Sequence, residues 1–292
     1  MLIDFPIDFY IPYFFVTITV LLSFWFKRIF LPTFVLLTAF TGVLYQNVFL
    51  LGNFLLLVFT GVVLLYEIAK RTPYSVSLII LVSIFFALFS LHYMPDFKNL
   101  LVATNVTVSE NAPSFDIELQ FDKAMAAIIL YLVSDISVKE KCINLYSLKI
   151  IFLTLLSACV LILPAALVSG FLKFDPKFPE EIAYIWMANN FLIVCFSEEV
   201  FFRGYLQNFF KNLELESRIP YIHIVITSII FGLVHIAGGG VYVVLSTVAG
   251  FCYGYAYEKT GRIMVAMIVH FSVTTIHFFL FTYPGLSSAI YG

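Results

Sequence analysis

The amino-acid sequence predicts an all-α fold, a polytopic bundle of about nine or ten transmembrane helices. Of the 292 residues, 62% are hydrophobic and only 12% are charged, whereas about a quarter of the residues in a soluble domain are charged. The mean hydropathy is +1.01. A soluble fold of this length could not bury so much apolar surface, so we expect the lipid bilayer to cover it. The formal net charge of −2 gives no reason to expect a nucleic-acid partner.

Apolar runs near the length of a membrane-crossing helix, about 20 residues, recur along the chain. The nine candidate spans are 8–26, 29–47, 48–66, 74–95, 149–170, 184–202, 220–236, 240–257 and 263–283. A tenth run, 124–137, is apolar but short, so it either crosses, re-enters or lies at the interface. We therefore expect a four-span region at 1–95, a polar loop at 96–123 and a C-terminal membrane region at 124–292. Alternating polarity in FDIELQF, within the loop, favours a short strand or an extended segment.

The basic residues predict an orientation. With ten spans and the N-terminus outside, 12 of the 16 Lys and Arg residues fall in inner loops, as the positive-inside rule expects. The outer four are Lys98, Lys123, Lys173 and Lys177. Asp4 and Asp8, but no basic residue, precede the first apolar run. This differs from a secretory signal, so we expect a retained membrane helix there. The four cysteines form no CxxC pair, and we expect no disulfide framework.

Ionisable side chains inside the last spans mark the candidate site. Insertion of a charged side chain into the bilayer costs about 2.5–3.5 kcal/mol of free energy, so we expect such a residue to have a structural or functional role. If each span is a straight helix, Glu199, His235 and His270 each lie within about 6 Å of one common level in the membrane. For each residue singly, hydrogen bonding between helices is as good an explanation. The matched depth of the set favours one shared site.

Helix spacing predicts different roles for the two adjacent carboxylates. Glu199 and Arg203 are four residues apart, which places them on one face within reach of an ion pair. Glu198 points about 100° away around the helix, which leaves it the freer carboxylate and the better candidate general base. The remaining histidines fall near span ends, where interfacial positions are expected: His92, His223 and His277.

Three motifs in this region resemble a known family. Glu198 to Arg203 matches EExxxR, Phe231 to His235 matches FxxxH, and His270 matches the histidine of HxxxN. In this order, about 35 residues apart along the chain, they resemble the CAAX protease and bacteriocin-processing family of intramembrane proteases, which includes relatives of the type II CAAX prenyl endopeptidases. The resemblance covers about 183–283. The sequence at 121–123, FDK before an apolar run, is also similar to many bacterial members.

The resemblance implies an endopeptidase in the bacterial cell membrane. Its substrate would be a membrane-associated peptide or protein, with a prenylated chain and a bacteriocin-type peptide as candidates. In active members the glutamate and the first histidine activate a water molecule, and the second histidine with its asparagine steadies the tetrahedral oxyanion. Carried onto this chain, the catalytic positions are Glu198, Glu199, His235 and His270, with Arg203 and Phe231 in support. The expected asparagine is replaced by Thr274, whose hydroxyl is a shorter donor.

The resemblance leaves the cofactor open. Glu198, His235 and His270 could hold a zinc ion with a fourth position open for water. A metal-free mechanism, with Glu198 as base and His270 at the oxyanion, fits the same residues. The chain has no HExxH motif, which excludes the common zincin arrangement.

Two other functions fit parts of the pattern. A non-catalytic membrane protein of the same fold, such as an immunity or scaffolding factor, would account for Thr274. A proton-coupled transporter would account for buried ionisable residues. Transporters usually have repeated halves, and the N-terminal half of this chain has no matching ionisable cluster.

Overall fold

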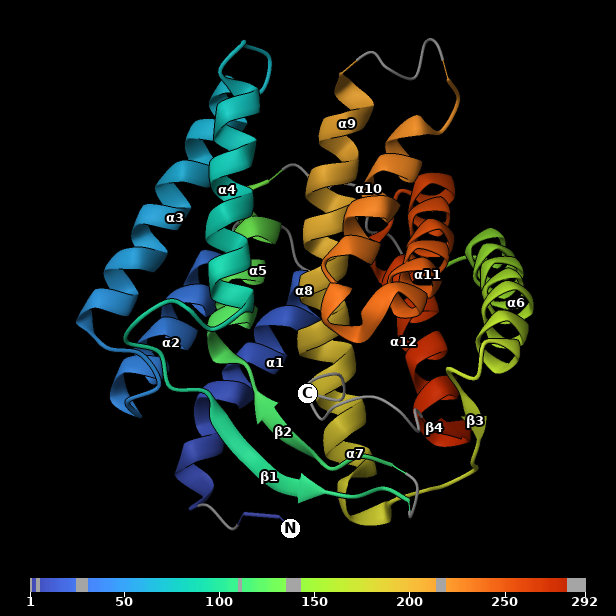
Figure 1. Ribbon diagram of the computed structural model, residues 1–292. Coiled ribbons are helices and arrows are strands. Elements are labelled where there is room, and N and C mark those ends of the chain that lie inside the picture. Colours follow the sequence, from blue (N-terminus) through green and yellow to red (C-terminus); the bar gives the residue numbers. More distant parts are fainter. Residues whose placement is uncertain are drawn as a thin grey trace.

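The computed structural model of this protein describes residues 2–3, 6–24, 31–109, 112–134, 143–213 and 219–282. It is a helical bundle with two small two-stranded sheets near one end (Figure 1). This confirms the predicted all-α class. Several basic residues of the orientation argument lie outside the described residues, as does one cysteine: Lys27, Arg28, Lys139, Lys141, Arg218 and Cys142.

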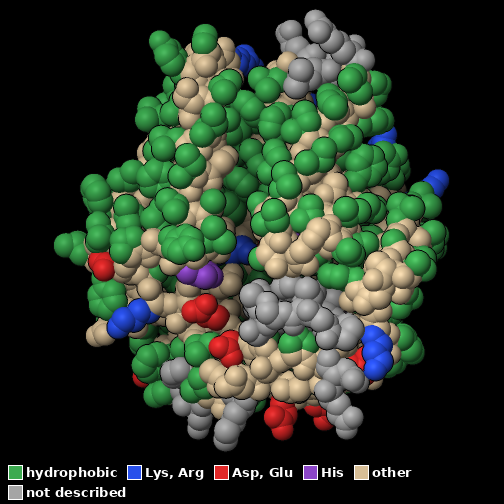
Figure 2. All heavy atoms as spheres, in the orientation of Figure 1, with side chains coloured by type: hydrophobic (Ala, Val, Ile, Leu, Met, Phe, Trp, Pro, Cys, Tyr) green, Lys and Arg blue, Asp and Glu red, His purple; other side chains and the backbone are tan. Residues whose placement is uncertain are grey.

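Four helices form the N-terminal group: α1 (Ile11–Ser23), α2 (Leu31–Leu44), α3 (Leu50–Ala69) and α4 (Ser75–Ser90). Their outward faces are apolar. Leu50, Leu57 and Ile68 on α3 are 88%, 70% and 80% exposed, which suits hydrocarbon but not water. Hydrophobic side chains cover most of the face drawn in Figure 2, and acidic side chains gather toward its lower end, where the β-hairpin of Figure 1 lies.

The short helix α5 (Phe121–Val133) lies inside the bundle. Every residue from Phe121 to Tyr131 is buried, because α5 packs against all four N-terminal helices and against the long helix described below. Its 13 residues span about 20 Å, less than the hydrocarbon core of about 30 Å. Whether the chain crosses here stays a prediction, because 135–142 lie outside the described residues. The placement of Lys123 in an outer loop is wrong, since its side chain lies inside the bundle.

A β-hairpin fills part of the predicted polar loop. Strands β1 (Leu100–Val106) and β2 (Phe115–Leu119) pair antiparallel, with Leu100 opposite Leu119 and Val106 opposite Phe115. Phe115 and Ile117 are buried while Asp116 is exposed, so the alternating polarity gives the strand that it predicted. A second pair, β3 (Lys173–Phe174) and β4 (Phe281–Thr282), joins the two sides of the C-terminal region.

The C-terminal region contains α6 (Leu145–Val168), α7 (Glu180–Asn189), α8 (Phe196–Glu199), α9 (Asn208–Asn212), α10 (Ile222–Leu233), α11 (Gly239–Thr260) and α12 (Ile263–Leu280). The π-helical stretches Asn190–Cys195 and Val200–Gln207 join α7, α8 and α9 into one helix, Glu180–Asn212. The long helix expected around the paired glutamates is therefore confirmed. The two glutamates lie between the π-helical stretches, and such stretches occur frequently at functional sites.

The apolar helices agree with the nine longer spans expected from the sequence. Among the described residues, five helices are long and apolar enough to cross a membrane: Leu50–Ala69, Leu145–Val168, Glu180–Asn212, Ile236–Thr260 and Ile263–Leu280. Four shorter apolar helices, Asp8–Ser23, Val35–Leu44, Ser75–Ser90 and Ile222–Leu233, fall in the other four expected spans. The protein is an integral membrane protein.

The helix α10 ends before His235, which corrects one expectation. We expected His235 within a spanning helix, but α10 stops at Leu233 and His235 occupies the turn that leads into α11. The break coincides with three consecutive glycines. Gly239 has φ of +84°, a conformation that glycine adopts without steric cost. The 12-residue α10 therefore brings His235 to the interior of the bundle and turns back.

Candidate active site

A buried ion pair organises the centre of the site. Arg203 Nε donates to Glu199 Oε2 at 3.1 Å, and both side chains are fully buried. This confirms the pair predicted from the four-residue spacing. The guanidinium also lies 5.0 Å from the centre of the Phe231 ring and 5.9 Å from that of Tyr253, so aromatic faces surround the rest of its charge.

His270 contacts the same carboxylate. Its Nδ1 lies 2.8 Å from Glu199 Oε1. Since Arg203 already pairs with this carboxylate, Glu199 is the acceptor and His270 Nδ1 carries the proton. The Tyr253 ring stacks on the imidazole at 4.5 Å. Glu199 and His270 therefore meet at one depth, as predicted, and the imidazole is held on both an edge and a face.

Glu198 is less free than we expected. Its Oε1 accepts a hydrogen bond from Lys123 Nζ at 3.2 Å, and the two side chains are 16% and 10% exposed. The reason is tertiary: α5 packs against α8 and delivers a lysine from 75 residues away. Within the described part of the chain, Oε2 of Glu198 accepts no hydrogen bond, so this oxygen is the one available to a water molecule.

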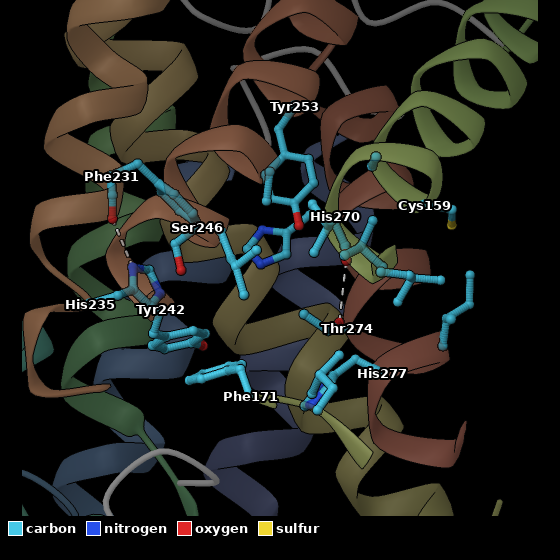
Figure 3. Close-up of a pocket in the computed structure, with 18 residues that line it drawn as sticks. Cys159, Phe171, Phe231, His235, Tyr242, Ser246, Tyr253, His270, Thr274 and His277 are labelled. Carbon is cyan, nitrogen blue, oxygen red and sulfur yellow. Dashed lines mark hydrogen bonds between the residues drawn. The ribbon is translucent and has the colours of Figure 1, made fainter. Parts of the chain in front are cut away.

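His235 is oriented by the backbone of its own motif. Its Nδ1 lies 2.7 Å from the carbonyl oxygen of Phe231 (Figure 3). A carbonyl only accepts, so Nδ1 is the donor and Nε2 is the nitrogen left for chemistry. The Phe231 ring contacts both histidines, with centroid distances of 4.8 Å to His235 and 5.9 Å to His270. Phe231 therefore packs against both imidazoles, which fits its expected supporting role.

Two cavities adjoin these residues. The first is polar, and Glu198, His235 and His270 line it together with Glu118 on β2. The second is largely apolar, and side chains from α6, α11 and α12 line it beside His235 and His270, as Figure 3 shows. His277 lines both cavities, so it belongs to the surroundings of the site as well as to the outer part of its helix.

Thr274 lies at the site and its hydroxyl forms a hydrogen bond with a neighbouring side chain. Its hydroxyl donates to Asn190 Oδ1 at 2.9 Å and also lies within hydrogen-bond distance of the carbonyls of Phe271 and His270. A hydroxyl has one proton, so these contacts are alternatives. Thr274 and Asn190 both line the polar cavity. The amide missing from position 274 therefore has a counterpart on the long helix.

The residues do not fit a zinc ion. Among the described residues, no group of three His, Cys, Asp or Glu side chains is placed to hold a metal. Lysine binds the carboxylate of Glu198, and arginine and histidine bind that of Glu199. We therefore derive no step through a metal, and the sequence-based prediction of zinc at Glu198, His235 and His270 stays a prediction.

Several residues near the site were absent from the sequence-based set. Lys123 and Asn190 come from helices or turns that no motif covers; only the FDK similarity at 121–123 pointed to the lysine. His92, which we expected at an interface, is 30% exposed and its Nδ1 lies 2.8 Å from Asp122 Oδ2. His223, also expected there, is buried and lies 3.1 Å from Glu258 Oε2. The three cysteines in the described ranges, Cys159, Cys195 and Cys252, are free thiols.

Two ionisable groups outside the spans have shifted pKa values: His92, and Glu118, which lines the polar cavity. Burial alone lowers the pKa of His92, but its hydrogen bond to Asp122 and the nearby negative charges outweigh this, so the pKa is raised from 6.5. Burial raises the pKa of Glu118, and the negative charges of Asp122 and Asp116 add to it. The negative charge of Asp122 on α5 raises both pKa values.

The segment that contains this site matches a protein family. Residues 180–276 match the family described as Type II CAAX prenyl endopeptidase Rce1-like. This segment is similar to the Rce1-like domain. It runs from the start of α7 into α12 and includes every motif residue from Glu198 to Thr274. The function of the Rce1-like family is of the CAAX intramembrane protease type. No curated protein and no solved structure matches the chain.

Proposed function

We propose that this Rce1-like protein is an intramembrane endopeptidase that uses Glu198 to activate a water molecule. The supporting observation is the difference in burial and hydrogen bonding between the two carboxylates. Glu199 is fully buried and bound by Arg203 and His270, whereas Glu198 lines the polar cavity with Oε2 unbound among the described residues. Of the two carboxylates, Glu198 is the one placed to meet water and substrate.

The reaction begins when Glu198 Oε2 accepts a proton from water. The water oxygen forms a bond to the carbonyl carbon of the peptide, and the carbonyl oxygen takes the negative charge. His235 Nε2 faces the same cavity and hydrogen-bonds the attacking water. The carbon–nitrogen bond then breaks, and the leaving amine takes the proton that Glu198 received. Lys123 stays hydrogen-bonded to Oε1, which keeps Oε2 turned toward the cavity.

Glu199 and Arg203 act as positioning residues in this scheme. Glu199 fixes the imidazole of His270 through Nδ1, and the orienting carboxylate is in turn fixed by Arg203. With Nδ1 as donor, His270 presents Nε2 to the cavity that it shares with Glu198. In its doubly protonated form the ring donates from Nε2 to the developing oxyanion.

The substrate that we propose is a membrane-associated peptide or protein. The apolar cavity between α6, α11 and α12 adjoins both histidines, so an apolar side chain or lipid group of the substrate has a place next to the scissile bond. The polar cavity on the other side suits backbone and water. A prenylated peptide and an unmodified hydrophobic peptide of bacteriocin type are the two classes to compare.

The test is cleavage of both peptide classes by purified protein in lipid nanodiscs. Glu198→Gln keeps the shape and removes the base, so cleavage should fall by about 10²–10⁴-fold, with the thermal unfolding temperature unchanged within a few degrees. Lys123→Met is the companion variant; it should lower kcat with little change in KM, because the base loses its orienting partner. Full activity of Glu198→Gln would refute the assignment of the base.

Thr274 supports a second candidate function. An asparagine completes the third motif in the resembled family, and its replacement fits a non-catalytic membrane protein of the same fold, such as an immunity or scaffolding factor. The same assay separates the two functions. If the wild-type protein cleaves neither peptide class, in EDTA or with added zinc, the non-catalytic function is favoured.

A further inference from the structure

Asn190 is the neutral amide nearest to the residue that replaces the missing asparagine. It lies at the start of the first π-helical stretch of the long helix, 84 residues before Thr274. It lines the polar cavity together with Glu198, His235 and His270. It is therefore the amide that the fold, rather than a motif, delivers to the site.

The hydrogen bonds of Asn190 determine which end of its amide faces the cavity. Thr274 Oγ1 donates to Asn190 Oδ1 at 2.9 Å, and Cys195 Sγ donates to the same oxygen at 3.4 Å. Two hydroxyl- or thiol-type donors therefore hold the carbonyl end. Within the described residues, the Nδ2 group donates to no protein atom, so its two N–H bonds are available to a ligand in the cavity.

The oxyanion of the proposed reaction needs such a donor whenever the His270 ring is not doubly protonated. His270 Nδ1 is committed to Glu199, so a neutral His270 ring has no proton on Nε2 and cannot donate there. The Thr274 hydroxyl donates its single proton to Asn190 or to a backbone carbonyl, so it has none left for the oxyanion. Of the two amide side chains that line this cavity, Asn189 donates from Nδ2 to the carbonyl of Glu118, whereas the Nδ2 group of Asn190 has no protein acceptor in the described structure.

We propose that Asn190 is a catalytic residue of this protein, and that its Nδ2 donates a hydrogen bond to the oxyanion of the tetrahedral intermediate. This inference rests on the proposed peptidase function. Thr274 then acts as a positioning residue, because its hydroxyl holds the carbonyl end of the Asn190 amide and turns the N–H end toward the substrate. An asparagine at position 274 and the Asn190–Thr274 pair are two ways of placing one amide donor.

A packing role for Asn190 makes a different prediction. If its amide only joins the long helix to α12, its replacement lowers thermal stability and leaves kcat per folded molecule unchanged. An oxyanion donor instead acts in the transition state, so its loss lowers kcat and leaves KM nearly constant. Removal of one such donor typically costs about 10²–10³-fold in kcat.

The experiment measures kcat, KM and unfolding temperature for Asn190→Ala, Asn190→Asp and the double variant Asn190→Ala/Thr274→Asn. A peptide cleaved by the wild-type protein is the substrate. Asn208→Asp is the matched control, because this residue lies on the same helix and bonds Tyr257 away from the cavity. We expect both single variants at Asn190 to lose about 10²–10³-fold in kcat, the control to keep it, and the double variant to recover at least tenfold over Asn190→Ala.

A binding measurement complements the rates. A phosphinate analogue of the cleaved peptide mimics the tetrahedral intermediate, so it should bind Asn190→Ala more weakly than wild type by a similar factor, while an uncleaved peptide analogue binds both equally. Wild-type cleavage with unchanged kcat in a folded Asn190→Ala protein would overturn this inference and leave the peptidase function standing. Absence of wild-type cleavage would overturn both.

Discussion

The buried Glu199–Arg203 pair gives the sharpest stability prediction. Both side chains are fully buried, and Nη1 and Nη2 of Arg203 have no hydrogen-bond partner among the described residues. Glu199 is thus the carboxylate that balances the guanidinium and also accepts the proton of His270. Glu199→Gln keeps the volume of the side chain but removes its charge, and leaves a buried cation facing only aromatic rings.

The expected cost follows from the burial. Breaking a buried ion pair by removing one partner costs about 3–5 kcal/mol. In a protein of this length, each kcal/mol lowers the unfolding temperature by about 2 °C. Glu199→Gln should therefore lower the apparent unfolding temperature by roughly 6–10 °C. Removal of both charges in Glu199→Gln/Arg203→Met should recover much of this loss, because no uncompensated charge remains.

Tryptophan fluorescence during heating, in one fixed detergent and at one scan rate, measures these differences. Glu198→Gln is the matched control, since it makes the same chemical change one residue earlier at a partly exposed carboxylate. We expect its unfolding temperature to change by less than about 3 °C, because the glutamine Oε1 can still accept the hydrogen bond of Lys123 Nζ. Equal unfolding temperatures for the two single variants would refute the assignment of Glu199 as the structural carboxylate.

Three further predictions concern the topology, His92 and Lys123. Single cysteines at positions 211 and 259, in a background without the native cysteines, should be labelled only from the cytoplasmic side; labelling of both from outside would reverse the orientation. The raised pKa of His92 means that its pairing with Asp122 stabilises the fold fully below about pH 6.5 and less as the pH rises through the folded-state pKa. His92→Gln should therefore cost more stability at pH 5.5 than at pH 8.5, and a pH-independent difference in unfolding temperature would contradict this. Lys123→Met should lower the unfolding temperature as well as kcat, because it leaves a partly buried carboxylate without its cation; an unchanged unfolding temperature would place the lysine in contact with water instead.

The membrane architecture could be predicted from the sequence because it depends on local properties. The length of an apolar run and the need to satisfy every backbone polar group within a helix decide where a chain crosses a bilayer. The four-residue spacing of Glu199 and Arg203 likewise decides their contact, since both lie on one helix. The alternation in β2 is local in the same way, and there too the expected element forms.

The break at His235 shows a limit of that reasoning. Hydropathy continues through 220–236, so the run was expected as one span. The helix nevertheless ends at Leu233, because the glycines at 238–240 permit a turn that the packing of α10 on α11 requires. Hydropathy indicates which residues can be buried in lipid, but it does not indicate where a buried helix ends and the chain turns back.

The long-range partners of Glu198 and Glu199 were decided by the tertiary structure. The sequence by itself determined that the protein lies in a membrane and that Glu199 pairs with Arg203, and it predicted a common depth for Glu199, His235 and His270. It did not determine the hydrogen bonds from Lys123 to Glu198, from His270 to Glu199, or from Thr274 to Asn190. These contacts join residues 71 to 84 positions apart. Such distances along the chain are closed only when α5 and α12 pack against the long helix, and motif spacing contains no information on which side chains those packing surfaces bring together.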